Sequence, residues 1–185
     1  MKILQIIGIF VVSLCVLSCG GTQNAVSDAD LAALDKIIND KNFRIECQWA
    51  MPTVSTSMMQ IAGSGLLAPG NNVQRIDLSG DGAFLEIKGD SAKADLPFYG
   101  ERQMGGGYNP DGEGIKFDQE VSDMEIEYQE NKKHYRITFS ANDGTKSFNV
   151  TLMVFQNKKT SVSVNSSERD FITYDGTLEE IPKKE

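Results

Sequence analysis

Histidine is almost absent from this sequence: His134 is the only one among 185 residues. Zinc sites usually combine several histidine or cysteine ligands, and serine or cysteine nucleophiles usually rely on a histidine base. His134 opens a strand-like segment beside polar turn residues, so we interpret it as a surface residue. The chain also lacks a phosphate-binding loop, a dinucleotide fingerprint and a nucleophile elbow. We therefore expect no cofactor and none of the common catalytic constellations.

Basic residues are also scarce. The chain has 18 lysines and arginines against 26 aspartates and glutamates, and its formal net charge at pH 7 is −8. A protein that binds nucleic acid through its phosphates, or an anionic membrane directly, needs a positive surface. The short basic runs Lys132-Lys133 and Lys158-Lys159 both fall in expected turns. We therefore expect no nucleic-acid partner.

Long apolar runs are missing except at the N-terminus, where Lys2 precedes a mostly apolar stretch over residues 3–17. That stretch is shorter than the roughly 20 residues that a membrane-spanning helix needs. A positive residue, an apolar core and then Cys19 resemble a bacterial lipoprotein signal, in which a peptidase cuts before a cysteine that carries lipid. The resemblance implies a signal peptide at 1–18, followed by lipidated Cys19 and a flexible tether over 19–27.

The lipoprotein signal would account for two of the three cysteines. Cys15 would leave with it and Cys19 would be acylated, so only Cys47 would remain and no intramolecular disulfide could form. Cys47 lies in a clear alternation, in which Phe43, Ile45, Cys47, Trp49 and Met51 are the apolar set. The alternation predicts a half-buried strand with Cys47 on its core side, as a small hydrophobe rather than a reactive thiol.

The sequence after this tether predicts a single mainly-β domain over residues 28–185, with one N-terminal helix. A capping-box-like start at Ser27 and apolar residues at helical spacing predict a helix that ends near Asn42. Turn signals then separate alternating runs at regular intervals, and about ten strands result. This pattern is typical of an antiparallel β-barrel or β-sandwich. Residues 146–155 are apolar on both faces near their end, which favours a closed or nearly closed sheet.

Two loops carry alternative interpretations. Residues 109–120 partly match a calcium loop, with ligand positions at Asn109, Asp111, Glu113 and Glu120. The first ligand position of a calcium loop is usually Asp, whereas here it is Asn109. Lys116 also stands where such a loop has an apolar residue, and a strand rather than a helix follows. We therefore expect a solvated acidic turn and no metal. Residues 58–67 are apolar and punctuated by glycine, which fits either a lid over a cavity or an irregular edge strand. We prefer the edge strand.

Two short motifs carry a family resemblance. Residues 96–100 read L-P-F-Y-G and residues 169–176 read R-D-F-I-T-Y-D-G. With the N-terminal signal and the order of strands, they resemble the domain-of-unknown-function family 4251 of small Bacteroides-type lipoproteins. The family's first motif usually has Tyr before Phe, whereas here Phe98 precedes Tyr99. The resemblance implies an outer-membrane lipoprotein and no established activity, and no acidic run follows Cys19, which favours the periplasmic face.

Two functions remain open at this point. The first is a non-catalytic binding or scaffold domain that meets a small molecule or another envelope protein through an exposed rim. Aromatic rings with polar tips favour such contacts, and the candidate rim residues are Phe98, Tyr99, Tyr108, Tyr174 and Arg169. If the rim is instead part of the core, Arg169 would pair with an acid such as Asp95 or Asp170. The second function is a carboxylate-dependent glycan hydrolase, which we consider the weaker alternative because no catalytic pattern accompanies the acidic residues.

Overall fold

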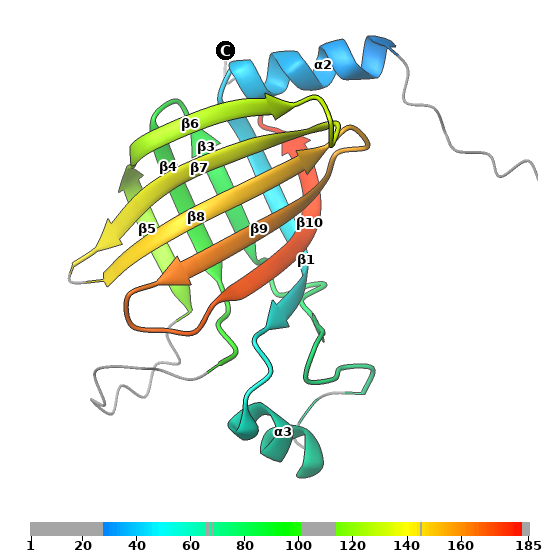
Figure 1. The fold of residues 1–185 in the computed structure, drawn as a ribbon, viewed down its shortest axis with the longest axis vertical. Helices are drawn as coiled ribbons and strands as arrows, with labels where there is room; N and C mark the ends of the chain where they lie inside the picture. Colours follow the sequence, from blue (N-terminus) through cyan, green and yellow to red (C-terminus); the bar gives the residue numbers. More distant parts are fainter. Residues whose placement is uncertain (1–27, 66, 68, 101–113, 145, 183–185) are drawn as a thin grey trace, which may run out of the picture.

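The computed structural model describes residues 28–65, 67, 69–100, 114–144 and 146–182. These residues form one antiparallel sheet of ten strands (Figure 1). The strands are β1 Asn42–Pro52, β2 Ile76–Asp77, β3 Phe84–Lys88, β4 Ser91–Leu96, β5 Ile115–Glu120, β6 Ser122–Gln129, β7 His134–Asp143, β8 Lys146–Phe155, β9 Lys159–Ser166 and β10 Ile172–Glu180. The prediction of a mainly-β fold with about ten strands is confirmed.

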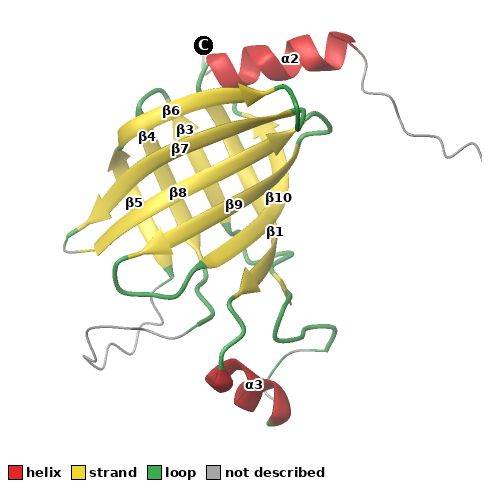
Figure 2. Ribbon diagram, viewed as in Figure 1, coloured by secondary structure: helices red, strands yellow, loops and turns green. Residues whose placement is uncertain are grey.

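The sheet curls until its two ends nearly meet. Its strand order is β5-β4-β3-β1-β10-β9-β8-β7-β6, and the short β2 pairs with β1 beside this path. Figure 2 shows β6 to β9 lying across β3, β4 and β5 as the opposite wall. Phe117 on β5 packs against Phe139 on β7 and Phe148 on β8, with ring centroids 6.4 and 5.8 Å apart. These aromatic contacts tie the two ends of the sheet together through the interior, so the sheet is a nearly closed barrel.

The strands bury one face because their apolar residues alternate. On β8 the side chains of Phe148, Val150, Leu152 and Val154 are buried, while Phe155 at its end is 37% exposed on the outside. β8 has β7 and β9 as hydrogen-bonded neighbours, as expected for a strand with apolar residues on both faces. Cys47 is 4% exposed and belongs to the core, as its place in the alternation predicts. Burial raises the pKa of its thiol to about 12, and the nearby Asp175 carboxylate adds to the rise.

Helix α2, Asp28–Asn39, lies across one end of the barrel (Figure 1). Leu34, Ile37 and Ile38 are buried against the sheet, as the helical spacing predicts. Asp35 accepts a hydrogen bond of 2.7 Å from the hydroxyl of Tyr135 on β7. The helix ends earlier than predicted, because Lys41 has a positive φ of 46° and turns the chain into β1.

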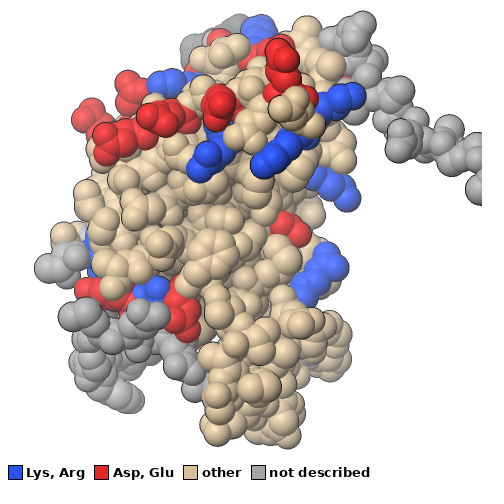
Figure 3. Space-filling view, in the orientation of Figure 1, with Lys and Arg blue, Asp and Glu red and all other residues tan. Residues whose placement is uncertain are grey.

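Helix α3, Thr56–Gly63, projects from the other end of the barrel. No second helix was predicted there, and the preferred edge strand is wrong. Ser55 caps the helix by accepting a hydrogen bond from the Met58 amide at 3.2 Å. Residues 48–74 contain no charged side chain, and the lobe around α3 is free of charge on the face in Figure 3. No helix among the described residues has the length and apolar character to cross a membrane.

Candidate functional site

The site begins with an irregularity in β1. The pairing of β1 with β10 shifts between Cys47 and Trp49, so Gln48 is an extra residue on the β1 side. Such a bulge reverses the faces of the residues that follow it. Cys47 and Ala50 are both buried, whereas Trp49 is half-buried on the outer face beside its cross-strand partner Asp175. The prediction that Trp49 shares the face of Cys47 is therefore wrong.

Gly176 makes this pairing possible. It lies opposite Cys47, and a Cβ added at Gly176 would clash with the backbone carbonyl of Glu46. Any larger residue would push β10 away from β1. Because Asp175 directly precedes Gly176, the same close approach sets Asp175 opposite Trp49 in the register of β1 and β10.

Arg75 covers the indole ring from the loop before β2. Its guanidinium carbon lies 3.8 Å from the centroid of the Trp49 ring, which is a cation–π contact. The loop is held by Asn72, whose side-chain oxygen accepts hydrogen bonds from the amides of Gln74 and Arg75 at 2.9 and 3.0 Å. Arg75 is also the first charged residue after the uncharged segment 48–74. Local turn geometry therefore positions the guanidinium over the ring.

The opposite wall comes from the hairpin between β8 and β9. Asn157 accepts a hydrogen bond of 3.1 Å from the Lys159 amide, and Lys158 has a positive φ of 61°. Phe155 packs on His134 with ring centroids 5.4 Å apart. His134 is only 5% exposed, so its predicted surface position is wrong: the Phe155 ring covers it. The hairpin thus holds Phe155 and Lys159 in place.

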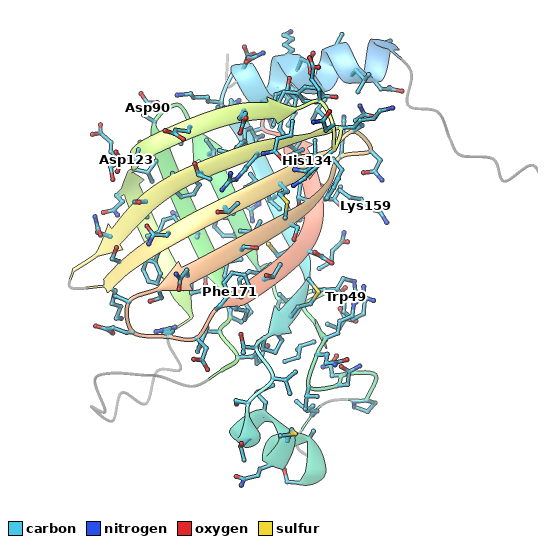
Figure 4. The ribbon with its side chains drawn as sticks, in the orientation of Figure 1. Trp49, Asp90, Asp123, His134, Lys159 and Phe171 are labelled. Atoms are coloured by element: carbon cyan, nitrogen blue, oxygen red, sulfur yellow. The ribbon has the colours of Figure 1, made fainter. Side chains whose placement is uncertain are left out.

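The bulge in β1, the facing part of β10, the loop before β2 and the β8–β9 hairpin line an open groove of about 490 Å³ on the outside of the barrel. We call it the Trp49 groove, and its lining residues are Gln48, Trp49, Arg75, Phe155, Gln156, Asn157, Lys159, Thr160, Asp175, Gly176 and Thr177. Figure 4 shows Trp49 and Lys159 on the same side of the barrel. The volume lies within the range of roughly 300–1,000 Å³ that is usual for small-molecule sites.

The Trp49 groove contains charges of both signs. Among the residues that the structure describes, no opposite charge lies within ion-pair distance of Arg75, Lys159 or Asp175. Some charges elsewhere on the outer surface are paired, as Lys93 is with Asp118 at 2.6 Å and Lys116 with Asp95 at 3.2 Å. Two cations and one half-buried carboxylate in the groove are therefore available to a ligand.

The predicted rim lies at the end of the barrel opposite α2, and part of it is buried. Tyr174 is 0% exposed and donates a hydrogen bond of 2.8 Å to the Pro97 carbonyl. Arg169 is 3% exposed, donates to the Gly114 carbonyl at 3.0 Å, and lies 5.0 Å from the centroid of the Phe98 ring. Tyr174 and Arg169 thus lack the exposed surface that was predicted for them, because they connect β10 and its preceding loop to the ends of β4 and β5.

The other rim residues have different positions. Phe98 and Tyr99 are half-buried, and Tyr108 lies outside the described residues. Burial raises the pKa of Tyr99, and the Asp81 carboxylate adds to the rise. Asp95 is paired with Lys116, so Asp95 is not the acidic partner predicted for Arg169, whereas the pairing of Arg169 with Asp170 stays a prediction.

The calcium-loop candidates can be followed only in part. Asn109, Asp111 and Glu113 lie outside the described residues, and Glu120 is an exposed residue at the end of β5. The described part of the chain contains no group of three or more histidine, cysteine or acidic side chains that could hold a metal ion.

The fold and groove define a class: a nearly closed antiparallel barrel with a helix across one end and a polar groove on its outer wall. Residues 25–178 match the family described as Domain of unknown function (DUF4251), and the chain belongs to that family. Its fold is similar to the crystal structure of a DUF4251 family protein from Bacteroides eggerthii DSM 20697, with a TM-score of 0.57 and 15% sequence identity. That similarity covers 85% of this chain and 92% of the other. No curated protein matches the sequence.

Proposed function

We propose that this protein is a lipid-anchored protein of the bacterial outer membrane that binds a small polar ligand in the Trp49 groove without transforming it. The observation that carries the binding role is the set of unpaired charges around Trp49. Arg75 and Lys159 are exposed and Asp175 is half-buried, so a ligand can reach all three charges. A concave site that combines an aromatic ring with a few convergent polar groups is typical of small-molecule binding. A ligand of complementary charge would supply the missing partners.

The anchor rests on the N-terminal sequence. Residues 1–18 have the pattern of a signal peptide that ends before Cys19, and α2 begins at Asp28. The segment between them can span at most about 30 Å, because an extended chain covers roughly 3.3–3.6 Å per residue. A lipid on Cys19 would therefore hold the barrel close to the membrane. We place the protein on the periplasmic face.

The choice of binding over catalysis rests on the groove's lining. A glycan hydrolase needs two carboxyl groups on either side of the scissile bond, about 5–10 Å apart. Asp175 is the one acidic residue among the residues that line the Trp49 groove. The groove therefore offers a hydrogen-bond acceptor for a ligand rather than an acid–base pair.

The chain provides its own reporter for the binding test. It contains a single tryptophan, and that tryptophan lies in the groove. The protein, produced from its full-length gene and purified in detergent, should change its tryptophan emission when amino acids, short peptides or oligosaccharides are titrated to millimolar concentration. If none of these ligand classes changes the emission, or if calorimetry shows that Trp49→Ala binds the ligand as tightly as the original protein, the proposed site is wrong.

The anchoring test uses Cys19. In a Gram-negative host the unchanged protein should fractionate with membranes and carry the added mass of acyl chains, whereas Cys19→Ser should lack that mass. Cys15→Ser is the matched control and should leave both properties unchanged. Acylation that survives Cys19→Ser would contradict the anchor.

A further inference from the structure

The arrangement of charges in the Trp49 groove points to a particular class of ligand. We infer that the groove binds a zwitterionic ligand, a short peptide with a free ammonium and a free carboxylate. This inference rests on the proposed binding function and specifies its ligand.

The charges alternate across three neighbouring strands. Lys159 on β9 pairs with Thr177 of β10, and Asp175 stands two residues before Thr177 on the same outer face. On the other side of Asp175, its β1 partner Trp49 carries Arg75 on its ring. The order across the groove is therefore cation, anion, cation. Trp49 lies one strand spacing of about 4.8 Å from Asp175, whereas Lys159 lies one strand across and two residues along, so its Cα is roughly 8 Å from that of Asp175.

Arg75 is suited to bind a carboxylate. A guanidinium that lies over an aromatic ring retains N–H donors at its edge, and their fork matches the two oxygens of a carboxylate. The contact with Trp49 also restricts the side chain before binding, which reduces the entropy lost when a ligand binds. Lys159 offers a second cation on the other side of Asp175.

Asp175 is suited to bind an ammonium. It is half-buried between β1 and β9, where a carboxylate attracts a cation more strongly than it would in bulk water. An ammonium on Asp175 and a carboxylate on Arg75 or Lys159 would be roughly 5–10 Å apart, because Arg75 lies over the ring of the cross-strand partner Trp49 and Lys159 lies diagonally across from Asp175. A dipeptide or tripeptide spans that distance, because each residue adds at most about 3.3–3.6 Å.

Other ligand classes fit the groove less well. An acidic saccharide would satisfy the two cations but would bring its own carboxylates close to Asp175, where like charges repel. A neutral saccharide would cover charged groups without neutralising them, which costs free energy. A zwitterion provides an opposite charge for both signs in the groove.

The test compares three versions of one ligand. A pool of tripeptides with free termini is titrated against the protein, followed by the same pool N-acetylated and the same pool C-amidated. A neutral oligosaccharide, cellotriose, is the fourth probe. Tryptophan emission and calorimetry report binding. The free pool should bind, and either cap should weaken binding roughly tenfold to hundredfold, because each removes a hydrogen bond between charged groups.

Single substitutions then assign each end of the peptide to its partner. Asp175→Asn should abolish the preference for a free over an acetylated N-terminus. Arg75→Gln should reduce the preference for a free over an amidated C-terminus. These preferences are ratios within one variant, so a general loss of stability would not imitate them. The matched controls, Asp118→Asn and Arg44→Gln, alter charges of the same kind outside the groove and should leave both ratios unchanged.

The outcomes separate the two proposals. Binding of the free pool with both ratios altered as stated supports the zwitterionic ligand. Equal binding of capped and free pools, or tighter binding of cellotriose, overturns it and leaves the groove as a binding site. If none of the four probes binds, the zwitterionic ligand is overturned. If the amino acids, peptides and oligosaccharides of the broader binding test also fail to bind, the proposed function fails as well.

Discussion

Replacing Tyr174 by phenylalanine removes one oxygen atom from the end of the barrel that lies opposite α2. The Tyr174 side chain is completely buried, and its hydroxyl donates a hydrogen bond of 2.8 Å to the Pro97 carbonyl. The substitution keeps the ring and leaves that carbonyl without its partner. A hydrogen bond of this kind contributes about 1 kcal/mol, and a stranded buried acceptor adds to the loss. Because Pro97 is itself half-buried and within reach of water, we expect Tyr174→Phe to lower the free energy of unfolding by about 1–2 kcal/mol.

Equilibrium urea unfolding measures this loss directly. The midpoint should fall while the slope of free energy against urea stays constant, because the substitution changes stability and not the surface exposed on unfolding. Tyr99→Phe is the matched control, since the Tyr99 hydroxyl makes no hydrogen bond to any residue that the structure describes. Its midpoint should stay within about 0.5 kcal/mol of the original protein.

The same variant has a second readout at high pH. Burial is the main cause that raises the pKa of Tyr174 well above its usual value. The folded protein therefore keeps the hydroxyl protonated when the unfolded chain ionises it, so stability falls as pH rises above about 10. Tyr174→Phe should remove this part of the fall. A variant that unfolds at the original urea midpoint, with the original pH dependence, would refute the structural role of Tyr174 and return it to the list of ligand-binding candidates.

Three further substitutions test the barrel. Burial raises the pKa of Cys47 from 9.0 to about 12, so its contribution to stability is complete below pH 9 and falls as pH rises further, by about 1.4 kcal/mol at pH 10. Cys47→Ala should flatten the pH dependence of the urea midpoint between pH 8 and 10, and an unchanged slope would contradict the burial of the thiol. Gly176→Ala should cost more than about 2 kcal/mol in urea unfolding, because its new Cβ would meet the Glu46 carbonyl. Gly63→Ala, at the end of α3 with open space around the new Cβ, should cost less, and the reverse order would exclude the close approach of β10 to β1. Phe117→Leu should lose about 1–3 kcal/mol of stability with its two aromatic contacts, and its thermal midpoint should fall. The control Phe171→Leu alters a half-exposed ring and should leave the thermal midpoint unchanged. Equal effects of the two substitutions would mean that the interior contacts do not join the ends of the sheet.

Much of the fold could be predicted because its signals are local. The alternation that buries Ile45 and Cys47, and the helical stripe that buries Leu34 and Ile38, are each complete within a dozen residues. Turn residues between the strands mark where the direction reverses. Helix α3 was missed because it is short and capped by a single serine, Ser55, within a segment whose apolar residues fit either period.

The candidate site could not be predicted in the same way. Trp49 lies in a run whose alternation places it inside, and only the bulge at Gln48 turns it outward. The apolar residue Ala50, in the opposite phase to Cys47, is the one sequence signal of that change. His134 was expected at the surface, and its burial depends on Phe155 from the neighbouring strand. Each error concerns a residue whose surroundings come from another strand.

The sequence by itself determined the class of the fold, the core faces of most strands and the N-terminal signal pattern, because hydrophobic period, turn chemistry and a short targeting segment act over neighbouring residues. The tertiary structure decided which residues share the Trp49 groove. Arg75, Lys159 and Asp175 are far apart along the chain, and they line one groove because β1 pairs with β2 and β10, and β10 pairs with β9. Strand pairing over such separations depends on the register of the whole sheet, and one extra residue in β1 is enough to reverse a side chain from the core to the groove.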